Sequence, residues 1–471
     1  MKIYTRAAKT GGTSLFLVSG ILATSLLLTG CPNANNGGDA ASGSPAPPAK
    51  NPAQGGGSPG ARGQTLATAQ GGSLTPSPTP TPLEKVKITE PVRGIYLSGW
   101  TVGGTKRWGQ LLDVVDKTEI NAMVIDVKED GMMSYKTDIP LAIEVGANHK
   151  MISDIDGKMA ELRKRKVYSI ARITCFRDEI TAKKRLDLSV HTAGGKHWRD
   201  SSGHYWLDPY NKANWDYNVD VAIDAAKRGF NEIQWDYVRF PSEGSKANRI
   251  YPAKEKGDLR SEARVIAEFL KYAKEKLKPY DVLVTADIFG LTVSAKPDDD
   301  MGIGQKVDMM TPNLDVICPM IYPSHYNRGE YGIPNPNAAP YKTVSTALKY
   351  AVERVKGTDC RIRPWLQDFS LGYRYGEPEV RAQIKAAREH GIEEYLLWNA
   401  SNRYTTAALV PLKSAKKKTD KVTATPSPTA KMASPSANVE STSVGTASPA
   451  SEPAVQKKPS EVATPKPSPI P

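Results

Sequence analysis

Eight short apolar runs alternate with longer amphipathic stretches in the middle of the chain, and this alternation constrains the fold more than any other feature. The runs, rich in Val, Ile, Leu and aromatic residues, are 93–98, 122–127, 167–173, 232–237, 282–288, 314–321, 361–368 and 394–399. The stretches with helical periodicity include 108–117, 152–164, 214–228, 259–278, 342–356 and 377–390. Buried strands that alternate with helices predict a parallel sheet, and eight repeats favour closure into a (β/α)8 TIM-type barrel.

Local signals agree with this α/β fold class. Gly229 and Gly391 each follow a helical stretch, at the position where a helix commonly ends in a left-handed residue. The sequence contains nothing that resembles a glycine-rich phosphate loop, which argues against an open nucleotide-binding sheet.

The first 30 residues have the pattern of a targeting segment. A positive start is followed by a short apolar run, and Leu28-Thr29-Gly30-Cys31 resembles the processing site of a bacterial lipoprotein signal peptide. The pattern predicts lipidation of Cys31, and hence an exported protein anchored to the membrane of the cell envelope. The alternatives are an ordinary secretory peptide or a single membrane anchor, although the run is shorter than a spanning helix requires.

Both flanks of the middle region are poor in residues that build a core. Residues 31–85 are rich in Gly, Pro, Ser, Ala and Thr, and residues 411–471 in Ser, Thr, Pro, Ala and Lys. Such composition predicts a disordered tether and a disordered tail around one folded domain, residues 86–410. Of the net charge of +13, residues 1–85 provide +4 and residues 411–471 provide +5, which leaves +4 for the domain. The charge therefore does not indicate a nucleic-acid partner. As a separate expectation, the protein is a monomer.

One predicted strand ends in an unusual group of side chains. Residues 232–241 read Glu-Ile-Gln-Trp-Asp-Tyr-Val-Arg-Phe-Pro, so an apolar run closes with Asp236 and Arg239. In a parallel barrel, groups at the carboxyl ends of the strands line the rim where active sites lie. Asp236 is therefore the first catalytic candidate. Its alternative roles are to cap the next helix or to pair structurally with Arg239.

Most other predicted strands end in carboxylates and aromatic residues as well. The candidates are Asp126, Lys128, Glu129, Arg172, Asp287, Tyr322, His325, Trp365, Gln367, Asp368 and Trp398. Glycoside cleavage needs one acid to protonate the leaving oxygen and a second carboxylate to attack the anomeric carbon or activate water, while aromatic faces stack on sugars. We predict that Asp236 and Asp287, on neighbouring strands, are catalytic. Arg239 and the other candidates are predicted to bind the saccharide.

Several candidates have structural alternatives. Asp126 and Glu129 either bind sugar hydroxyls or act catalytically, or Lys128 simply neutralises one of them. Asp368 either joins the site or caps the following turn. Arg172 and Arg239 either hold acidic substituents or favour the deprotonated form of Asp236 by proximity. Trp365 and Trp398 are alternatively part of the core, because inward positions of a barrel take bulky groups.

The remaining residue types do not indicate a metal site or another cofactor. His149, His191, His197 and His204 are too scattered for metal-ligand spacing, so we expect no catalytic metal. Cys175, Cys318 and Cys360 lack close spacing and are expected to be small buried side chains, with one disulfide-bonded pair as the alternative.

Six motifs resemble those of a bacterial family of glycoside hydrolase domains. They are Arg93-Gly94-Ile95-Tyr96, Val124-Ile125-Asp126-Val127-Lys128, Gln234 to Pro241, Ala286-Asp287-Ile288-Phe289-Gly290, Pro319 to His325 and Trp365-Leu366-Gln367. The resemblance implies a (β/α)8 barrel remotely similar to those of alpha-amylases and alpha-galactosidases. Those enzymes place a nucleophilic Asp after the fourth strand, which implies that role for Asp236. Alpha-amylase-like enzymes place an acid/base Glu after the fifth strand, where this chain has Asp287.

The sequence therefore predicts an envelope-anchored glycoside hydrolase that cleaves a polysaccharide or oligosaccharide. A carbohydrate-binding barrel without turnover is the main alternative, and a structural envelope protein without a ligand is the third.

Overall fold

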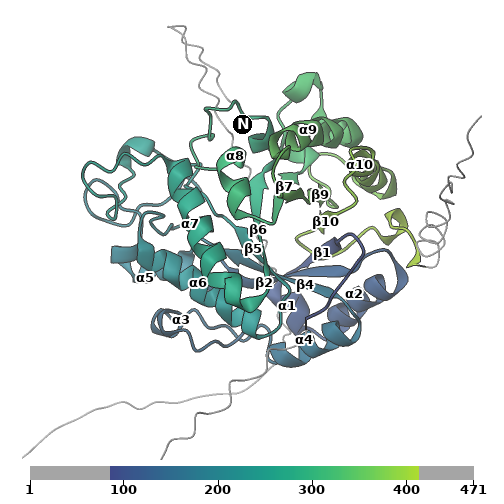
Figure 1. Cartoon of the computed structure of the whole chain (residues 1–471), viewed down its shortest axis with the longest axis horizontal. Coiled ribbons are helices and arrows are strands. Elements are labelled where there is room, and N and C mark those ends of the chain that lie inside the picture. Colours follow the sequence, from purple (N-terminus) through teal and green to yellow (C-terminus); the bar gives the residue numbers. More distant parts are fainter. Residues whose placement is uncertain (1–84, 413–471) are drawn as a thin grey trace, which may run out of the picture. The chain divides into compact units, whose positions relative to one another are not determined.

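The computed structural model describes residues 85–412 (Figure 1). The predicted signal peptide, Cys31 and nearly all of the predicted tether and tail lie outside the described residues. No helix within 85–412 combines the length and the apolar character needed to cross a bilayer.

The strands form a closed parallel barrel, which confirms the predicted fold class (Figure 1). They are β1 (Arg93–Leu97), β2 (Ala122–Glu129), β4 (Tyr168–Thr174), β5 (Glu232–Asp236), β6 (Leu283–Phe289), β7 (Val316–Ile321), β8 (Arg361–Ile362), β9 (Trp365–Gln367) and β10 (Tyr395–Trp398). β1 pairs with both β2 and β10 and so closes the barrel. The short β8 and β9 share the seventh position. Pro364, which has no N–H to donate, lies between them and divides the run predicted at 361–368.

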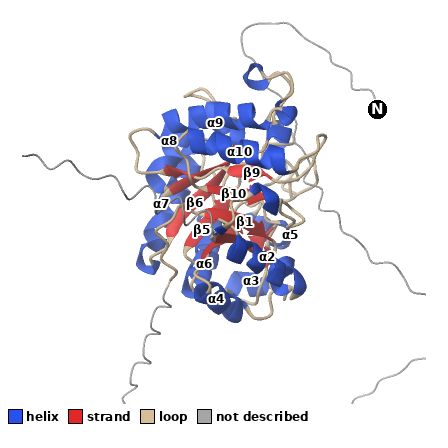
Figure 2. Ribbon diagram, turned by 90° about the vertical axis from the view of Figure 1, so that its right-hand side faces the viewer, coloured by secondary structure: helices blue, strands red, loops and turns tan. Residues whose placement is uncertain are grey.

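Helices surround the barrel (Figure 2). The longer ones are α2 (Lys106–Lys117), α4 (Ile155–Lys164), α6 (Lys212–Lys227), α7 (Glu262–Leu277), α9 (Pro340–Val355) and α10 (Glu377–Glu389), which match the six predicted stretches. Shorter helices are α1 (Gly99–Gly103), α3 (Pro140–Glu144), α5 (Glu179–Lys184) and α8 (Val307–Met310). Helices α4 and α7 begin later than predicted because Asp154 and Ser261 cap their first turns. Gly229 and Gly391 have φ values of 94° and 75°, which confirms the left-handed helix stops.

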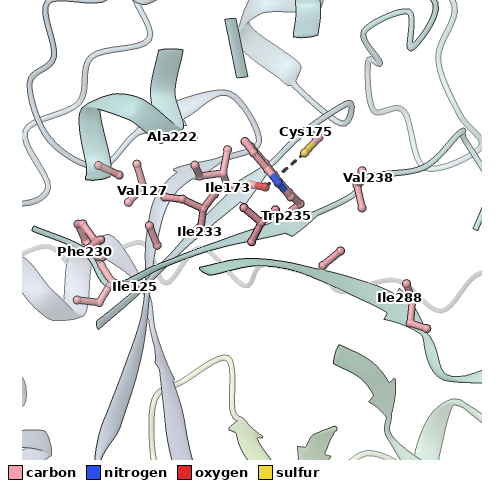
Figure 3. Close-up of a cluster of buried hydrophobic side chains, with 14 of the residues drawn as sticks. Ile125, Val127, Ile173, Cys175, Ala222, Phe230, Ile233, Trp235, Val238 and Ile288 are labelled. Carbon is pink, nitrogen blue, oxygen red and sulfur yellow. Dashed lines mark hydrogen bonds between the residues drawn. The ribbon is translucent and has the colours of Figure 1, made fainter. Parts of the chain in front are cut away.

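Alternation along β5 separates two kinds of environment. Ile233 and Trp235 belong to the large apolar cluster outside the barrel, together with Ile173 and Val127 (Figure 3). Glu232 and Asp236 contact side chains from other strands of the barrel. Successive side chains of a strand point to opposite faces, so β5 lines the barrel interior with polar groups and packs against the helices with apolar ones.

The cysteines Cys175, Cys318 and Cys360 are all buried free thiols. This confirms the expectation that they are small buried side chains, and the alternative of a disulfide-bonded pair does not hold for these three.

Candidate active site

Arg172 on β4 lies at the centre of a buried cluster of carboxylates. Its guanidinium is only 3% exposed, and Nη1 donates to Asp126 Oδ1 at 2.6 Å and to Glu129 Oε2. Nε and Nη2 both donate to Asp236 Oδ2, at 2.9 and 2.6 Å. Three of the predicted site carboxylates, from two separate strands, therefore converge on one predicted site arginine.

Two aromatic rings contact the same guanidinium. The rings of Tyr96 on β1 and Trp398 on β10 stack with centroids 4.0 Å apart, and Cζ of Arg172 lies 5.7 and 5.3 Å from their centroids. The Tyr96 hydroxyl donates to Asp126 Oδ2 at 2.5 Å. Together, the rings and carboxylates leave Arg172 little freedom to move, so the groups it binds are held in fixed positions.

Asp236 is the last residue of β5, and the backbone turns sharply after it. Tyr237 has φ 48°, a left-handed conformation that is uncommon for a bulky side chain and characteristic of functional sites. This turn brings the Tyr237 N–H to within 2.7 Å of Asp236 Oδ1. Both carboxylate oxygens of Asp236 therefore accept hydrogen bonds, one from the backbone and one from Arg172.

Asp287 lies on β6, the strand next to β5. The pairing of Trp235 with Ala286 places the following residues, Asp236 and Asp287, at the same level of neighbouring strands. Asp287 is 1% exposed, and its Oδ1 accepts the indole N–H of Trp365 at 2.7 Å. Burial, and secondly the charge of Asp236, raises the pKa of Asp287 well above its ordinary value. A raised pKa favours the protonated form of this carboxyl group, which can serve as an acid.

Two other carboxyl groups of the cluster also favour their protonated forms. Burial raises the pKa of Asp126, and it raises the pKa of Glu129 to about 8, although Arg172 opposes the shift in both. The side chain of Glu129 is 30% exposed, which makes it the most accessible carboxyl group bound to Arg172. Carboxyl groups whose pKa values are raised by burial in this way are typical of sites of proton transfer.

Lys128 does not join the cluster, which corrects the prediction that it binds substrate. Its side chain is fully buried; Nζ donates to Asp178 Oδ2 at 3.0 Å and to Asn218 Oδ1 at 2.8 Å. The alternative role for Lys128, to neutralise Asp126 or Glu129, is not observed either. Lys128 instead forms a buried ion pair on the outer side of the sheet.

A β-bulge explains the position of Lys128. Asp126 pairs with Arg172, but Lys128 pairs with Ile173, so the register of β2 against β4 shifts between these two residues. The extra residue places Lys128 on the outer face with Ile173 and returns Glu129 to the inner face, where it meets Arg172. Strict alternation from Asp126 would have given the opposite result.

Other predicted site residues connect the loops that follow the strands. Gln367 accepts the backbone N–H of Ser324 at 3.0 Å and donates to the carbonyl of Phe369 at 2.9 Å. Asp368 accepts the N–H and hydroxyl of Thr405 at 2.8 and 2.6 Å. These two residues fix the positions of the loops, and nothing in their contacts brings them to Arg172.

Tyr322 and His325 lie just after β7 (Val316–Ile321). Their rings meet edge to face with centroids 5.3 Å apart, and His325 Nδ1 is 2.9 Å from Ser324 Oγ. Burial, and secondly the charges of Asp287 and Asp236, raises the pKa of Tyr322 well above its ordinary value. Tyr322 is therefore near the catalytic candidates and keeps its hydroxyl proton, whereas His325 is exposed at the edge of the site.

The structure adds residues that the sequence reasoning missed. Tyr96 and Tyr237 are at strand ends, so the rule that selected Asp236 could have found them as well. Arg177 stacks on the Tyr237 ring at 3.8 Å, donates to the Tyr237 hydroxyl and binds Asp130 Oδ1 at 2.6 Å. Arg177 lies three residues beyond β4, and no periodic signal marks it. In the described part of the chain, no three His, Cys, Asp or Glu side chains are grouped so as to hold a metal ion.

Three solved structures are similar to this chain, and the first of them agrees with this fold. The glycoside hydrolase domain of PgaB from Bordetella bronchiseptica matches with a TM-score of 0.50 and 14% identity, over 66% of this chain and 95% of that one. A hypothetical protein from Ruminiclostridium thermocellum is 36% identical over 41% of this chain and 96% of its own, with a TM-score of 0.38. An alpha-galactosidase from Thermus thermophilus matches with a TM-score of 0.43 and 12% identity, over 71% and 62% of the two chains.

No curated protein matches the sequence. A family model does match, and it extends from residue 94 to residue 404, from the second residue of β1 to the segment after β10. This match includes all strands of the barrel and every residue of the carboxylate cluster. The chain therefore belongs to the family described as "Putative glycosyl hydrolase domain".

Proposed function

We propose that the protein is an envelope-anchored glycoside hydrolase that cleaves a glycosidic bond in a polysaccharide or oligosaccharide. The observation that carries the proposal is the position of Asp236 and Asp287 at the same level of neighbouring strands, in different environments. Asp236 accepts hydrogen bonds at both oxygens, whereas Asp287 is buried beside Trp365. Paired carboxyl groups with separate protonation states are what glycoside hydrolysis requires.

In this proposal Asp236 acts in its charged form, as a nucleophile at the anomeric carbon or as a base that activates water. The N–H groups of Arg172 and Tyr237 orient its oxygens before the substrate arrives. A preorganised carboxylate needs little rearrangement during the reaction, which favours the transition state.

Asp287 is the proposed acid that protonates the leaving oxygen. The Trp365 N–H occupies Oδ1, so Oδ2 is the position that carries the proton. Glu129 is a second candidate for this role, since it also has a raised pKa and is the more exposed of the two. Trp398, which is half-buried and stacked on Tyr96, is the proposed platform for a sugar ring.

A first experiment compares the full chain with Asp236→Asn on a panel of envelope and plant polysaccharides. We expect new reducing ends with the parent and none with the variant, while the variant still binds the glycan in calorimetry. Binding by both proteins without any product would favour the carbohydrate-binding alternative and contradict the hydrolase.

A second experiment assigns the acid. Asp287→Asn and Glu129→Gln are assayed on the cleaved glycan and on a dinitrophenyl glycoside of the same sugar, whose leaving group needs no protonation. The variant that lacks the acid should lose activity on the glycan and keep it on the activated substrate. If Glu129→Gln alone behaves in this way, Asp287 is not the acid.

The proposed location depends on the N-terminal sequence. Lipidation of Cys31 would hold the catalytic domain at the envelope, and the enzyme would act there as a monomer, because one chain provides all of the proposed site residues. We expect Cys31→Ser to release the protein from the membrane fraction of its host and to abolish labelling by a fatty-acid probe. Unchanged labelling would contradict the anchor and leave the hydrolase proposal intact.

A further inference from the structure

Arg239 is a buried arginine without an acidic partner at the end of the barrel that holds Asp236. It is 6% exposed, and its Nη1 donates to the carbonyl of Phe240 at 3.0 Å and to Ser242 Oγ at 3.3 Å. Among residues 85–412, no carboxylate forms a salt bridge with its guanidinium. A buried charge without a counter-charge is unfavourable, so this arrangement requires an explanation.

The two neighbouring arginines differ from Arg239 in this respect. Arg172 binds three carboxylates, and Arg177 binds Asp130. Glu243 is an acid near Arg239, but its Oε2 accepts hydrogen bonds from two serine hydroxyls, those of Ser201 and Ser202. Within residues 85–412, acidic partners are therefore present for two of the three guanidinium groups and absent for the third.

The free nitrogen atoms of Arg239 remain open to a ligand. Within the described structure, each guanidinium nitrogen of Arg239 either has a hydrogen-bond partner or is accessible to solvent. Nε and Nη2 have no acceptor in that part of the chain, so they must reach accessible space. A planar pair of N–H donors of this kind matches the two oxygens of a carboxylate.

Aromatic rings hold Arg239 beside the catalytic pair. Its Cζ lies 4.6 Å from the centroid of Phe289, 4.9 Å from that of Trp206 and 5.1 Å from that of Tyr237. Tyr237 directly follows Asp236, and Phe289 is the last residue of β6, two positions after Asp287. The rings thus fix the guanidinium between the ends of the two strands that carry the proposed catalytic residues.

The charges of the site leave Arg239 in excess. Burial favours the protonated forms of Asp126, Glu129 and Asp287, while Arg172 forms an ion pair with Asp236 and Arg177 forms one with Asp130. Burial lowers the pKa of Arg239 to about 10, which still leaves it charged at neutral pH. One positive charge therefore faces the substrate without compensation.

We propose that Arg239 binds an acidic group on the sugar next to the cleaved bond, so that the substrate is an acidic glycan, such as one built from uronic acids. This inference rests on the proposed hydrolase function and specifies its substrate class. A sulfate or phosphate ester offers similar anionic oxygens, but the planar fork of Arg239 favours the carboxylate.

The test uses the full chain and matched pairs of glycans. Oligosaccharides of uronic acids are compared with their carboxyl-reduced forms, which keep the linkage and lose the charge, and with sulfated neutral oligosaccharides. Calorimetry measures binding, and the release of reducing ends measures cleavage. We expect the parent to favour at least one uronic-acid oligosaccharide over its reduced form by about 10- to 100-fold, the range for a hydrogen bond to a charged group.

Variants assign this preference to Arg239. Arg239→Gln should abolish the preference while it still binds the reduced form, and Arg239→Lys should recover only part of it, because Lys lacks the planar fork. The control is Lys227→Gln, which removes the same charge at an exposed residue at the end of α6, before the start of β5, whereas the site lies at the end of that strand. Circular dichroism and thermal melting establish that each variant is folded.

Each outcome decides the inference separately from the hydrolase proposal. Cleavage of neutral glycans at the same rate as acidic ones would overturn the acidic substrate and support the hydrolase. Preferential binding of uronic-acid glycans without cleavage would support the role of Arg239 and contradict the hydrolase. A preference for the sulfated set alone would overturn the carboxylate assignment, as would an unchanged preference in Arg239→Gln or binding to none of the glycans.

Discussion

The two ends of the barrel interior each contain a buried arginine surrounded by carboxylates. At the end where the strands begin, Arg363 lies between β8 and β9, and its Nη1 donates to both oxygens of Glu232 at 2.7 and 3.0 Å. Its Nε donates to Glu394 Oε2 at 2.7 Å. At the end where the strands finish, Arg172 binds Asp126, Glu129 and Asp236. We call these the Arg363 cluster and the Arg172 cluster.

The clusters differ in their balance of charge. In the Arg363 cluster two carboxylates, Glu232 and Glu394, face two arginines, because Arg361 also binds Glu394. Hydroxyl groups of Tyr168 and Thr285 donate to Glu232 at 3.1 and 2.9 Å. The opposing charges are therefore equal in number, and Glu232 has several donors in place of water.

In the Arg172 cluster the acids outnumber the bases. Three carboxyl groups bind one guanidinium, and Asp287 lies nearby. Burial disfavours their charged forms and negative charges repel one another, so the pKa values of Asp126, Glu129 and Asp287 are raised. Removing one partner from a balanced buried cluster leaves an unpaired buried charge and destabilises the fold, whereas an unbalanced cluster keeps protons available for chemistry. The comparison teaches that charge balance, more than burial, separates a structural cluster from a candidate catalytic one.

The largest expected effect is on kcat, when one carboxylate is replaced by its amide in each of the two clusters. Asp236→Asn should lower kcat by about 10,000-fold, the scale for a catalytic residue that acts as a nucleophile, and should lower the thermal midpoint less than Glu232→Gln does, because Asp126 and Glu129 still bind Arg172. Glu232→Gln should lower the thermal midpoint and leave kcat per folded molecule unchanged. Steady-state kinetics and melting curves test this, and a large loss of kcat in Glu232→Gln would break the comparison.

Removal of the central arginine should affect stability most in the balanced cluster. Arg363→Met leaves Glu232 buried without its counter-charge, which should cost about 3–5 kcal/mol in the free energy of unfolding. Arg172→Met should cost less, because Asp126 and Glu129 already favour their protonated forms. Denaturant titrations at pH 5 and pH 7.5 measure both. A larger loss for Arg172→Met at both pH values would contradict this ranking.

The raised pKa of Glu129 should make stability depend on pH. Its pKa is about 8 in the folded chain and near 4.5 when exposed, so the folded state binds the proton more tightly. The contribution is complete below pH 4.5 and is lost as the pH rises toward 8, by about 1–2 kcal/mol after solvent screening. Glu129→Gln should flatten this part of the stability curve, whereas Glu394→Gln serves as a control from the Arg363 cluster. An unchanged slope in Glu129→Gln would contradict the shift.

The smallest effect concerns sugar stacking. Trp398→Ala should raise KM for the cleaved glycan by about 3- to 10-fold, or about 1 kcal/mol, because the substrate loses one aromatic face. Tyr395→Phe, on the same strand but facing the outer cluster, is the matched control and should leave KM unchanged. If Trp398→Ala lowers stability and leaves KM unchanged, Trp398 is part of the core, which is the alternative interpretation of the sequence.

The sequence by itself determined the barrel and the strand ends at which the acidic groups gather. Apolar runs of strand length alternating with amphipathic stretches leave few ways to bury both, and parallel closure places the ends of all strands at one rim. The positions of Asp236, Asp287, Arg172 and Trp398 follow from that rule. The same rule applies to Tyr96, which lies near the end of the first strand.

Only the tertiary structure decided which neighbouring side chains meet. The bulge in β2 sends Lys128 outward to Asp178 and Glu129 inward to Arg172, and no periodic pattern reveals one extra residue in a strand. That Arg239 has no acidic partner among residues 85–412 is equally invisible in sequence, because a salt bridge depends on distances between segments far apart in the chain. Local periodicity sets the direction of a strand's side chains, but contacts across the barrel set their charge and their chemistry.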